Sequence, residues 1–97
     1  MQKSIKHLKD IEIGQFVFSK KGRDKALAFV VVSIEENYVF LVDGDKRKFE
    51  NPKKKKMLHI QHTSYVDNKL KHLILSNNCK NSDFRGAIKE YLLLKER

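Results

Sequence analysis

The sequence of 97 residues contains one cysteine, one proline and no tryptophan. A single cysteine, Cys79, excludes an intramolecular disulfide, so nothing in the composition indicates secretion. No apolar run reaches the ~20 residues that a membrane-spanning helix needs. The basic N-terminus also lacks the apolar segment of a signal peptide. We therefore expect a cytoplasmic protein that has no membrane partner.

The signatures of common enzymes and metal sites are also missing. There is no phosphate-binding loop of the G-x-x-x-x-G-K type, no G-x-G-x-x-G fingerprint and no C-x-x-C pair. Cys79 lies in a polar linker without an obvious oriented base, and the spacing of His59, His62 and His72 does not suit a zinc finger. We expect no catalytic residue, no bound metal, no cofactor and no small-molecule substrate.

Acidic residues are few compared with basic ones, and the excess is concentrated. The chain has 21 Lys and Arg but 12 Asp and Glu, which gives a net charge of +9. Residues 20–25 hold four basic and one acidic residue, and residues 46–56 hold seven and one, so these two segments contain the whole excess. A solubilising charge would be spread over the surface. Charge gathered in two loop-like segments indicates a site for a polyanion.

The first two thirds of the chain are rich in β-branched and aromatic residues separated by turn signals. We predict five strands, at residues 15–19, 27–34, 38–42, 46–50 and 58–62. Gly22, Asn37 and Gly44 mark the turns between the first four. Short strands joined by hairpin turns favour a small antiparallel barrel. Residues 1–12 have no firm period and are expected to form a partly ordered lead-in, with a short helical turn at residues 5–9.

The last third of the chain has helical periodicity. Ser64 and Asp67 resemble a capping arrangement, and the helix that follows them is expected to end at residues 77–78. Ser82 is expected to start a second helix. Residues 27–34 are apolar on both faces, so another element must cover the outer face of that strand. The two helices are the candidates for this cover.

Several of these stretches together resemble a KOW motif. They are Gly14-Gln15-x-Val17, Lys21-Gly22-Arg23-Asp24-Lys25, Val30-Val31-Val32 and Leu41-Val42-Asp43-Gly44, with Arg47-Lys48 and the 52–56 segment downstream. Residues 13–63 are thus similar to the small bacterial KOW-domain RNA-binding proteins. Those proteins are related to the KOW-domain large-subunit ribosomal proteins of eukaryotes and archaea. Ala26 departs from the family, which commonly has a second glycine at that position.

The resemblance implies an SH3-like, five-stranded antiparallel barrel over residues 13–63 that binds RNA, with ribosomal RNA as the first candidate. Residues 64–97 would then form a helical extension of two short α-helices packed on the barrel. The implied role is in translation on the ribosome, with ribosomal proteins as further partners. The alternative is a protein-interaction KOW module of a transcription or translation assembly. Clustered lysines favour nucleic acid over a protein-docking surface, but charge alone does not distinguish RNA from DNA.

The candidate RNA-binding residues are the basic residues of the two charged segments and the glycine of the first turn. They are Lys20, Lys21, Gly22, Arg23, Lys25, Lys46, Arg47, Lys48, Lys53, Lys54, Lys55 and Lys56. The four consecutive lysines repel one another, and a polyphosphate would relieve that repulsion, whereas the alternative for this run is a solvated loop. Because hairpin connections emerge together at the end of a barrel, we expect the two segments to form a single site.

Arginine and aromatic side chains are the candidates for contacts beyond charge attraction. Arg23 and Arg47 can hold a phosphate with two donors or stack on a base. The alternative for both arginines is an ion pair with a nearby carboxylate, at Asp24, Asp43 or Asp45. Phe49 and Tyr65 are the candidates for base stacking, with a core position as the alternative for Phe49. The other aromatic residues of the strands are expected in the core, at Phe16, Phe18, Phe29 and Phe40.

Overall fold

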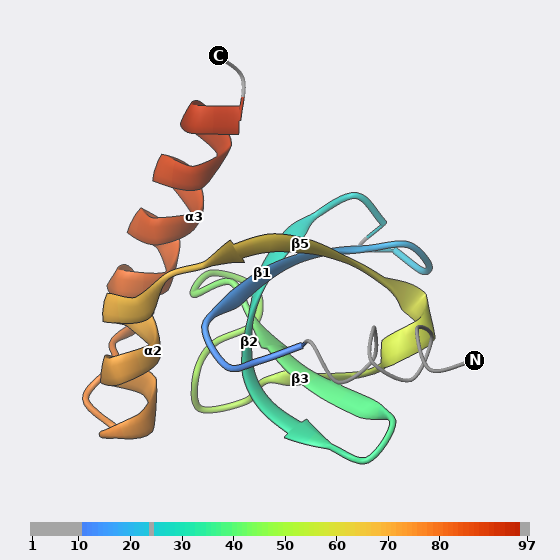
Figure 1. The fold of residues 1–97 in the computed structure, drawn as a ribbon, viewed down its shortest axis with the longest axis horizontal. Coiled ribbons are helices and arrows are strands. Elements are labelled where there is room, and N and C mark those ends of the chain that lie inside the picture. The colour runs from blue at the N-terminus through green and yellow to red at the C-terminus, as the bar shows by residue number, and fades with distance from the viewer. Residues whose placement is uncertain (1–10, 24, 96–97) are drawn as a thin grey trace.

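The computed structural model of the protein describes residues 11–23 and 25–95. The elements run in the order β1 (Gln15–Ser19), β2 (Ala28–Glu35), β3 (Tyr38–Val42), β4 (Lys53–Lys56), the 3₁₀ helix η1 (Met57–His59), β5 (Ile60–Val66), α2 (Asn68–Leu75) and α3 (Asn81–Lys95) (Figure 1). The fold is mainly β with two C-terminal helices, as the sequence predicts. The helical turn expected at residues 5–9 lies outside the described residues.

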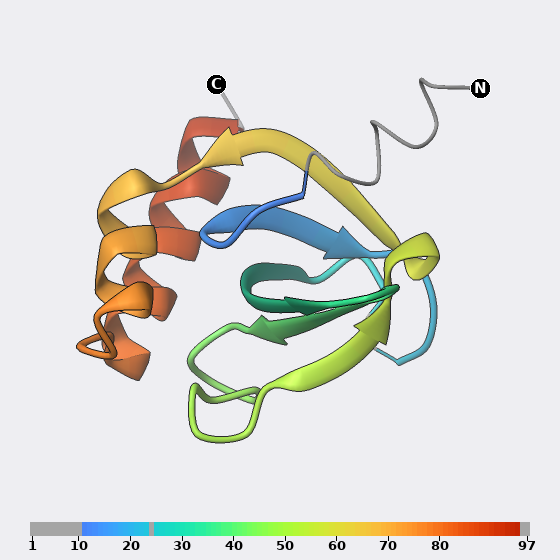
Figure 2. The ribbon, with the colours of Figure 1, turned by 60° about the horizontal axis from the view of Figure 1, so that its bottom comes forward.

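All five strands belong to one antiparallel sheet with the order β4-β3-β2-β1-β5. Within the described residues β4 and β5 are its edges, and no ladder joins them. The sheet is strongly curled, so that β5 and β4 lie on opposite sides of β1, β2 and β3 in Figure 2. The register shifts between Gln15 and Val17 in β1 and between Val31 and Ser33 in β2. Such irregularities increase the bend and twist of a strand.

The fourth strand is not where the sequence predicts it. Residues 46–50 are irregular. The lysine run forms β4 instead, and all four lysines pair with residues of β3. The cause is a side chain: Asp43 Oδ1 accepts hydrogen bonds from the backbone N–H groups of Asp45 (2.9 Å) and Arg47 (2.8 Å). This bonding folds the chain back on itself, so the β3 ladder is resumed only at Lys53. The alternative of a solvated loop for the lysine run is therefore wrong.

The fifth strand and the first helix also begin later than predicted. Residues 57–59 form η1, and β5 continues to Val66. Val66 is therefore the last residue of a strand and not part of the helix that follows. Asp67 is the N-cap of α2 and accepts a hydrogen bond from the Leu70 N–H at 3.0 Å. Ser64, which resembled the capping residue, lies within β5. The strand hydrogen bonds of β5 with β1 take precedence over a local cap there.

Two hydrophobic clusters use the two faces of the sheet, as the apolar faces of residues 27–34 indicate. The inner cluster lies within the curl and contains Ile11, Val17, Phe29, Val31, Val39, Leu41 and Ile60. The outer cluster lies under the helices and contains Phe16, Val30, Val32, Val42, Leu70, Ile74, Cys79 and Phe84. Among the aromatic residues expected in the core, Phe16 and Phe29 are buried, while Phe18 and Phe40 are half-buried.

Cys79 is part of the outer cluster and has no reactive environment. Burial, with a further contribution from the nearby Asp83 carboxylate, raises the pKa of the Cys79 thiol to about 11. A thiol with that pKa stays protonated at neutral pH and is a poor nucleophile. Cys79 therefore acts as a small apolar side chain between the two helices.

Candidate nucleic-acid interface

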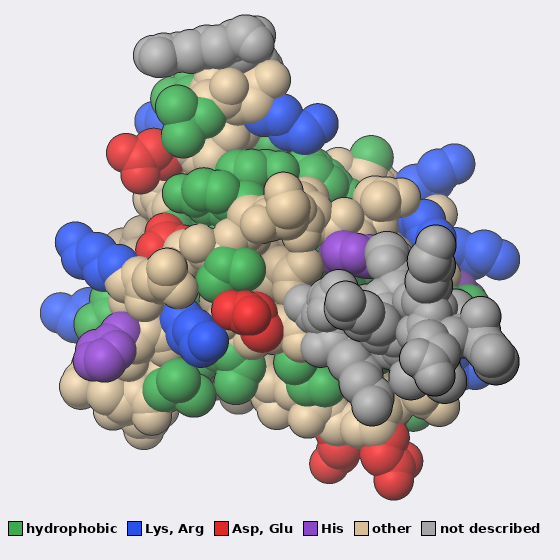
Figure 3. All heavy atoms as spheres, in the orientation of Figure 1, with side chains coloured by type: hydrophobic (Ala, Val, Ile, Leu, Met, Phe, Trp, Pro, Cys, Tyr) green, Lys and Arg blue, Asp and Glu red, His purple; other side chains and the backbone are tan. Residues whose placement is uncertain are grey.

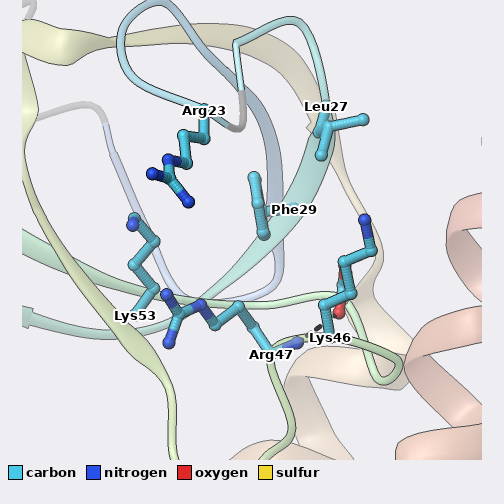
Figure 4. A pocket seen from close by; sticks show the side chains of 7 residues that line it. Arg23, Leu27, Phe29, Lys46, Arg47 and Lys53 are labelled. Atoms are coloured by element: carbon cyan, nitrogen blue, oxygen red, sulfur yellow. Dashed lines mark hydrogen bonds between the residues drawn. The ribbon is translucent and has the colours of Figure 1, made fainter.

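A pocket of about 340 Å³ lies between the turn that follows β1 and the connection from β3 to β4. Its lining residues are Arg23, Leu27, Phe29, Asp43, Lys46, Arg47 and Lys53. Figure 4 shows the Arg23 and Lys46 side chains on opposite sides of the Phe29 ring, each coming from a different segment. We call it the basic pocket. It brings residues of the 20–25 and 46–56 segments together, as the expected hairpin arrangement requires.

The start of α3 fixes the β3–β4 connection that carries two of the pocket's cations. Gly44 adopts a φ of +81°, and a Cβ atom there would lie 2.3 Å from the Asn81 carbonyl oxygen, so only glycine fits. The Gly44 carbonyl accepts a hydrogen bond from Arg85 Nη1 at 2.6 Å. Asn81 Oδ1 accepts another from the Phe49 N–H at 2.8 Å. The helical extension therefore positions the basic connection as well as covering the sheet.

The two aromatic residues considered for base stacking are engaged elsewhere. Phe49 is half-buried and packs on Phe84, with the ring centroids 5.4 Å apart. Tyr65 contacts Phe16 and Tyr91, each at a centroid distance of 5.1 Å. Neither Phe49 nor Tyr65 lines the basic pocket. The core position is thus the one that Phe49 takes.

Glu50, the only acid of the 46–56 segment, is held next to α3. Its carboxylate accepts a hydrogen bond from Asn81 Nδ2 at 3.0 Å. That hydrogen bond is the main reason that the pKa of Glu50 lies below its ordinary value, and the neighbouring Lys48 ammonium adds to the shift. Glu50 does not line the basic pocket, so the segment's negative charge is not placed among the pocket's cations.

The four lysines of β4 alternate between two environments, because successive strand side chains point to opposite faces. Lys53 is half-buried and lines the pocket, and Lys55 is buried. Lys55 Nζ donates a hydrogen bond to the Lys21 carbonyl at 2.7 Å. Lys54 and Lys56 are exposed, and Lys54 Nζ lies 4.5 Å from the centroid of the Tyr38 ring. Lys55 thus holds the turn that carries Arg23, while Lys54 and Lys56 are available to solvent.

Backbone hydrogen bonds fix the ends of the first basic turn. The Ala26 N–H donates to the Ser19 carbonyl at 2.7 Å, and the Lys20 N–H donates to the His59 carbonyl at 2.8 Å. Gly22 has a φ of +87° and Ala26 a φ of +72°. For a residue with a Cβ this left-handed conformation costs about 1–2 kcal/mol. Ala26 nevertheless adopts it, so the turn has the same backbone conformation that a glycine would allow there. Between these anchors the Lys20, Lys21, Arg23 and Lys25 side chains are exposed.

The electrostatic field of the lysines acts on one imidazole. The pKa of His59 lies below its ordinary value of 6.5, chiefly through partial desolvation and then through Lys21, Lys56, Lys55 and Lys20. Both basic segments therefore contribute to one region of positive potential. Among the described residues that line the pocket there are four cationic side chains and one carboxylate, that of Asp43.

The arginines of the pocket are not neutralised within the described part of the chain. There, neither the Arg23 nor the Arg47 guanidinium forms an ion pair with Asp43 or Asp45. Arg47 meets Asp43 through its backbone: its N–H donates to Asp43 Oδ1, and its carbonyl accepts from the Asp43 N–H at 2.9 Å. Asp24, the other carboxylate considered for Arg23, lies outside the described residues. The guanidinium groups are therefore donors without a carboxylate acceptor among the described residues.

Three residues that line the pocket are not among the candidate site residues predicted from the sequence. Phe29 is 1% exposed and belongs to the inner cluster, and Asp43 is explained by its turn, yet both border the pocket. Leu27 is 44% exposed beside them. The signal was present in the alternation of residues 27–34, which places Leu27 and Phe29 on the same face next to the basic turn.

Other kinds of site are not found in the described part of the chain. No three His, Cys, Asp or Glu side chains gather there as a metal site would require. No helix among those residues has the length and apolar character needed to cross a membrane. The sequence matches no protein-family model and no curated protein. The chemistry of the basic pocket is therefore the main structural indication of function.

Proposed function

We propose that this protein binds RNA through the basic pocket and the turns around it, and that it acts in translation in the cytoplasm on the ribosome or its RNA. One observation carries the proposal: Arg23, Lys46, Arg47 and Lys53 come from separate parts of the chain and line one pocket. Bringing cations together costs free energy unless an anion offsets their repulsion. A phosphate backbone does so and releases its counterions on binding.

The fold that we propose is an SH3-like barrel of the KOW type. Support comes from the curled five-stranded antiparallel sheet and from the inner cluster that β1, β2, β3 and β5 enclose. The two edge strands follow one another in the chain and are connected by η1 alone, which keeps them close at one end. The choice of RNA over DNA, and of ribosomal RNA in particular, depends on the resemblance to KOW-domain proteins over residues 13–63.

Crosslinking in cells tests this function. The parent protein is expected to crosslink to ribosomal RNA, and a variant with Arg23→Gln and Arg47→Gln is expected to lose most of the signal. The matched control, Lys69→Gln with Lys89→Gln, removes the same charge from exposed helix positions and should retain crosslinking. Crosslinks spread evenly over messenger RNAs, or equal losses in both double variants, would contradict the proposal.

A second candidate function, a protein-interaction module, is favoured by the apolar end of α3. Leu93 is 56% exposed and Leu94 is 51% exposed, although α3 otherwise packs on the sheet. Figure 3 shows hydrophobic side chains gathered along α3 and the sheet beside it, with lysines and arginines at the margins of that face. A variant with Leu93→Ser and Leu94→Ser that binds naked RNA normally but no longer sediments with ribosomes would support this role.

A further inference from the structure

The basic pocket contains more than a phosphate site needs. A patch that only neutralises a backbone requires exposed cations, yet two apolar side chains, the exposed Leu27 and the buried Phe29, also line this pocket. In Figure 4 Arg23 and Lys53 lie to one side of the Phe29 ring, and Lys46 lies to the other. The ligand of such a pocket must therefore combine an apolar part with negative charge.

We propose that the basic pocket receives a single unpaired nucleotide of the bound RNA. This inference rests on the proposed RNA-binding function. The pocket volume of about 340 Å³ is near the lower end of the ~300–1,000 Å³ typical of small-molecule sites, which suits one nucleotide better than a stack of bases. A base that is unpaired costs less to bring out of its stack than a paired one. A fully paired duplex keeps the faces of its bases inside the stack and could reach only the rim.

The arrangement of charges orients the nucleotide. Asp43 is half-buried, as are Arg47 and Lys53, whereas Arg23 and Lys46 are exposed. The Asp43 carboxylate would repel a phosphate beside it, so the phosphate belongs near Arg23 and Lys46 and the base belongs closer to Leu27. Phe29 is only 1% exposed, so the surfaces left for the base are the Leu27 side chain and the guanidinium planes. Arginine planes and apolar side chains are common partners of unstacked RNA bases.

The test compares a short, fully paired RNA duplex with the same duplex carrying one bulged adenosine. We expect the parent protein to bind the bulged duplex about tenfold more tightly, in line with the contribution of one stacked base. Leu27→Thr should bring this ratio close to one. Leu27→Met, which keeps the apolar surface, should retain the ratio. Ile34→Thr is the matched control, because Ile34 is 37% exposed at the other end of β2 and does not line the pocket.

The outcomes separate this inference from the proposed function. Equal affinity of the parent protein for both duplexes would overturn the nucleotide site and leave RNA binding intact. A lack of binding to either RNA would overturn the proposed function itself. Free adenosine monophosphate, added as a competitor, distinguishes the source of the nucleotide. Displacement of the bulged duplex by the mononucleotide at concentrations near the Kd of the RNA would assign the pocket to free nucleotides and overturn the inference.

Discussion

The side of the sheet under the helices and the side that carries the basic pocket are built on opposite physical principles. Phe84 is fully buried on the first side, and the side chains around it are apolar. On the second side Arg23 and Lys46 are exposed, and the described residues of the basic pocket include four cations and one carboxylate. The outer cluster and the inner cluster both supply stability, whereas the cations of the basic pocket repel one another. The comparison teaches that the second side depends on the first, because α3 holds the connection that carries the cations.

Removing the largest side chain that α3 buries should have the greatest effect. Phe84→Ala is expected to lower the free energy of unfolding by about 3–5 kcal/mol, since it deletes a fully buried ring. Denaturant unfolding monitored by circular dichroism measures the loss. Leu93→Ala, at an exposed leucine of the same helix, should change stability by less than about 0.5 kcal/mol. If both variants unfold like the parent, α3 is an appendage and the dependence that we infer is absent.

The two environments of β4 predict unequal effects for neighbouring lysines. Lys55→Met should lower the free energy of unfolding by roughly 1–3 kcal/mol, because it removes a hydrogen bond from a buried ammonium to the Lys21 carbonyl. Lys54→Met should have little effect on stability, since Lys54 is exposed. Thermal melts of the two variants measure the difference. Equal melting temperatures would show that Lys55 does not hold the basic turn.

Neutralising the three remaining lysines of β4 should weaken RNA binding. For the parent, about five phosphate contacts predict that log K falls with log salt at a slope of about −3.5 to −4.5. Lys53→Gln, Lys54→Gln and Lys56→Gln together should make the slope shallower by roughly 2 to 3 and weaken binding similarly for every RNA. Fluorescence anisotropy at several salt concentrations gives the slope. A slope near zero for the parent protein would exclude a phosphate-binding surface.

The smallest effect concerns the ionisation of His59. In the free protein desolvation and nearby lysines hold the pKa of His59 below 6.5, so its contribution to stability is present above pH 6.5 and is lost as the pH falls through the folded value. Bound phosphates would offset the lysines and raise that pKa. Nuclear magnetic resonance titration of the imidazole with and without RNA measures the change. An unaltered pKa would place the RNA away from His59.

The parts of the fold that the sequence predicted depend on local patterns. β1 and β3 have the bounds that alternation and turn residues indicate, and β2 is displaced by one residue. The error at residues 46–50 has one local cause and one distant cause. The Asp43 carboxylate turns the chain, and Asn81, far along the sequence, holds the Phe49 N–H. Neither contact leaves a periodic signal in the sequence.

The sequence predicted which charged residues form the candidate site, but it did not predict the environment of each lysine. The concentration of the net charge in two segments identified Arg23, Lys46, Arg47 and Lys53, and hairpin geometry indicated that the segments would meet. The different environment of Lys55 was not predictable while the lysine run was placed between the predicted strands at residues 46–50 and 58–62. Only the strand register, which alternates side chains between the two faces, distinguishes Lys55 from its neighbours.

The position of the lysine run at the edge of the sheet has a consequence for self-association. β4 is an edge strand, and an unprotected edge offers free backbone groups to the strands of another molecule. Charged side chains, lysines in particular, prevent such edge-to-edge pairing because two copies repel each other. The residues that attract RNA would thus also keep the free protein from polymerising through its sheet. Neutralising them, whether by mutation or by acetylation, would remove this protection of the edge.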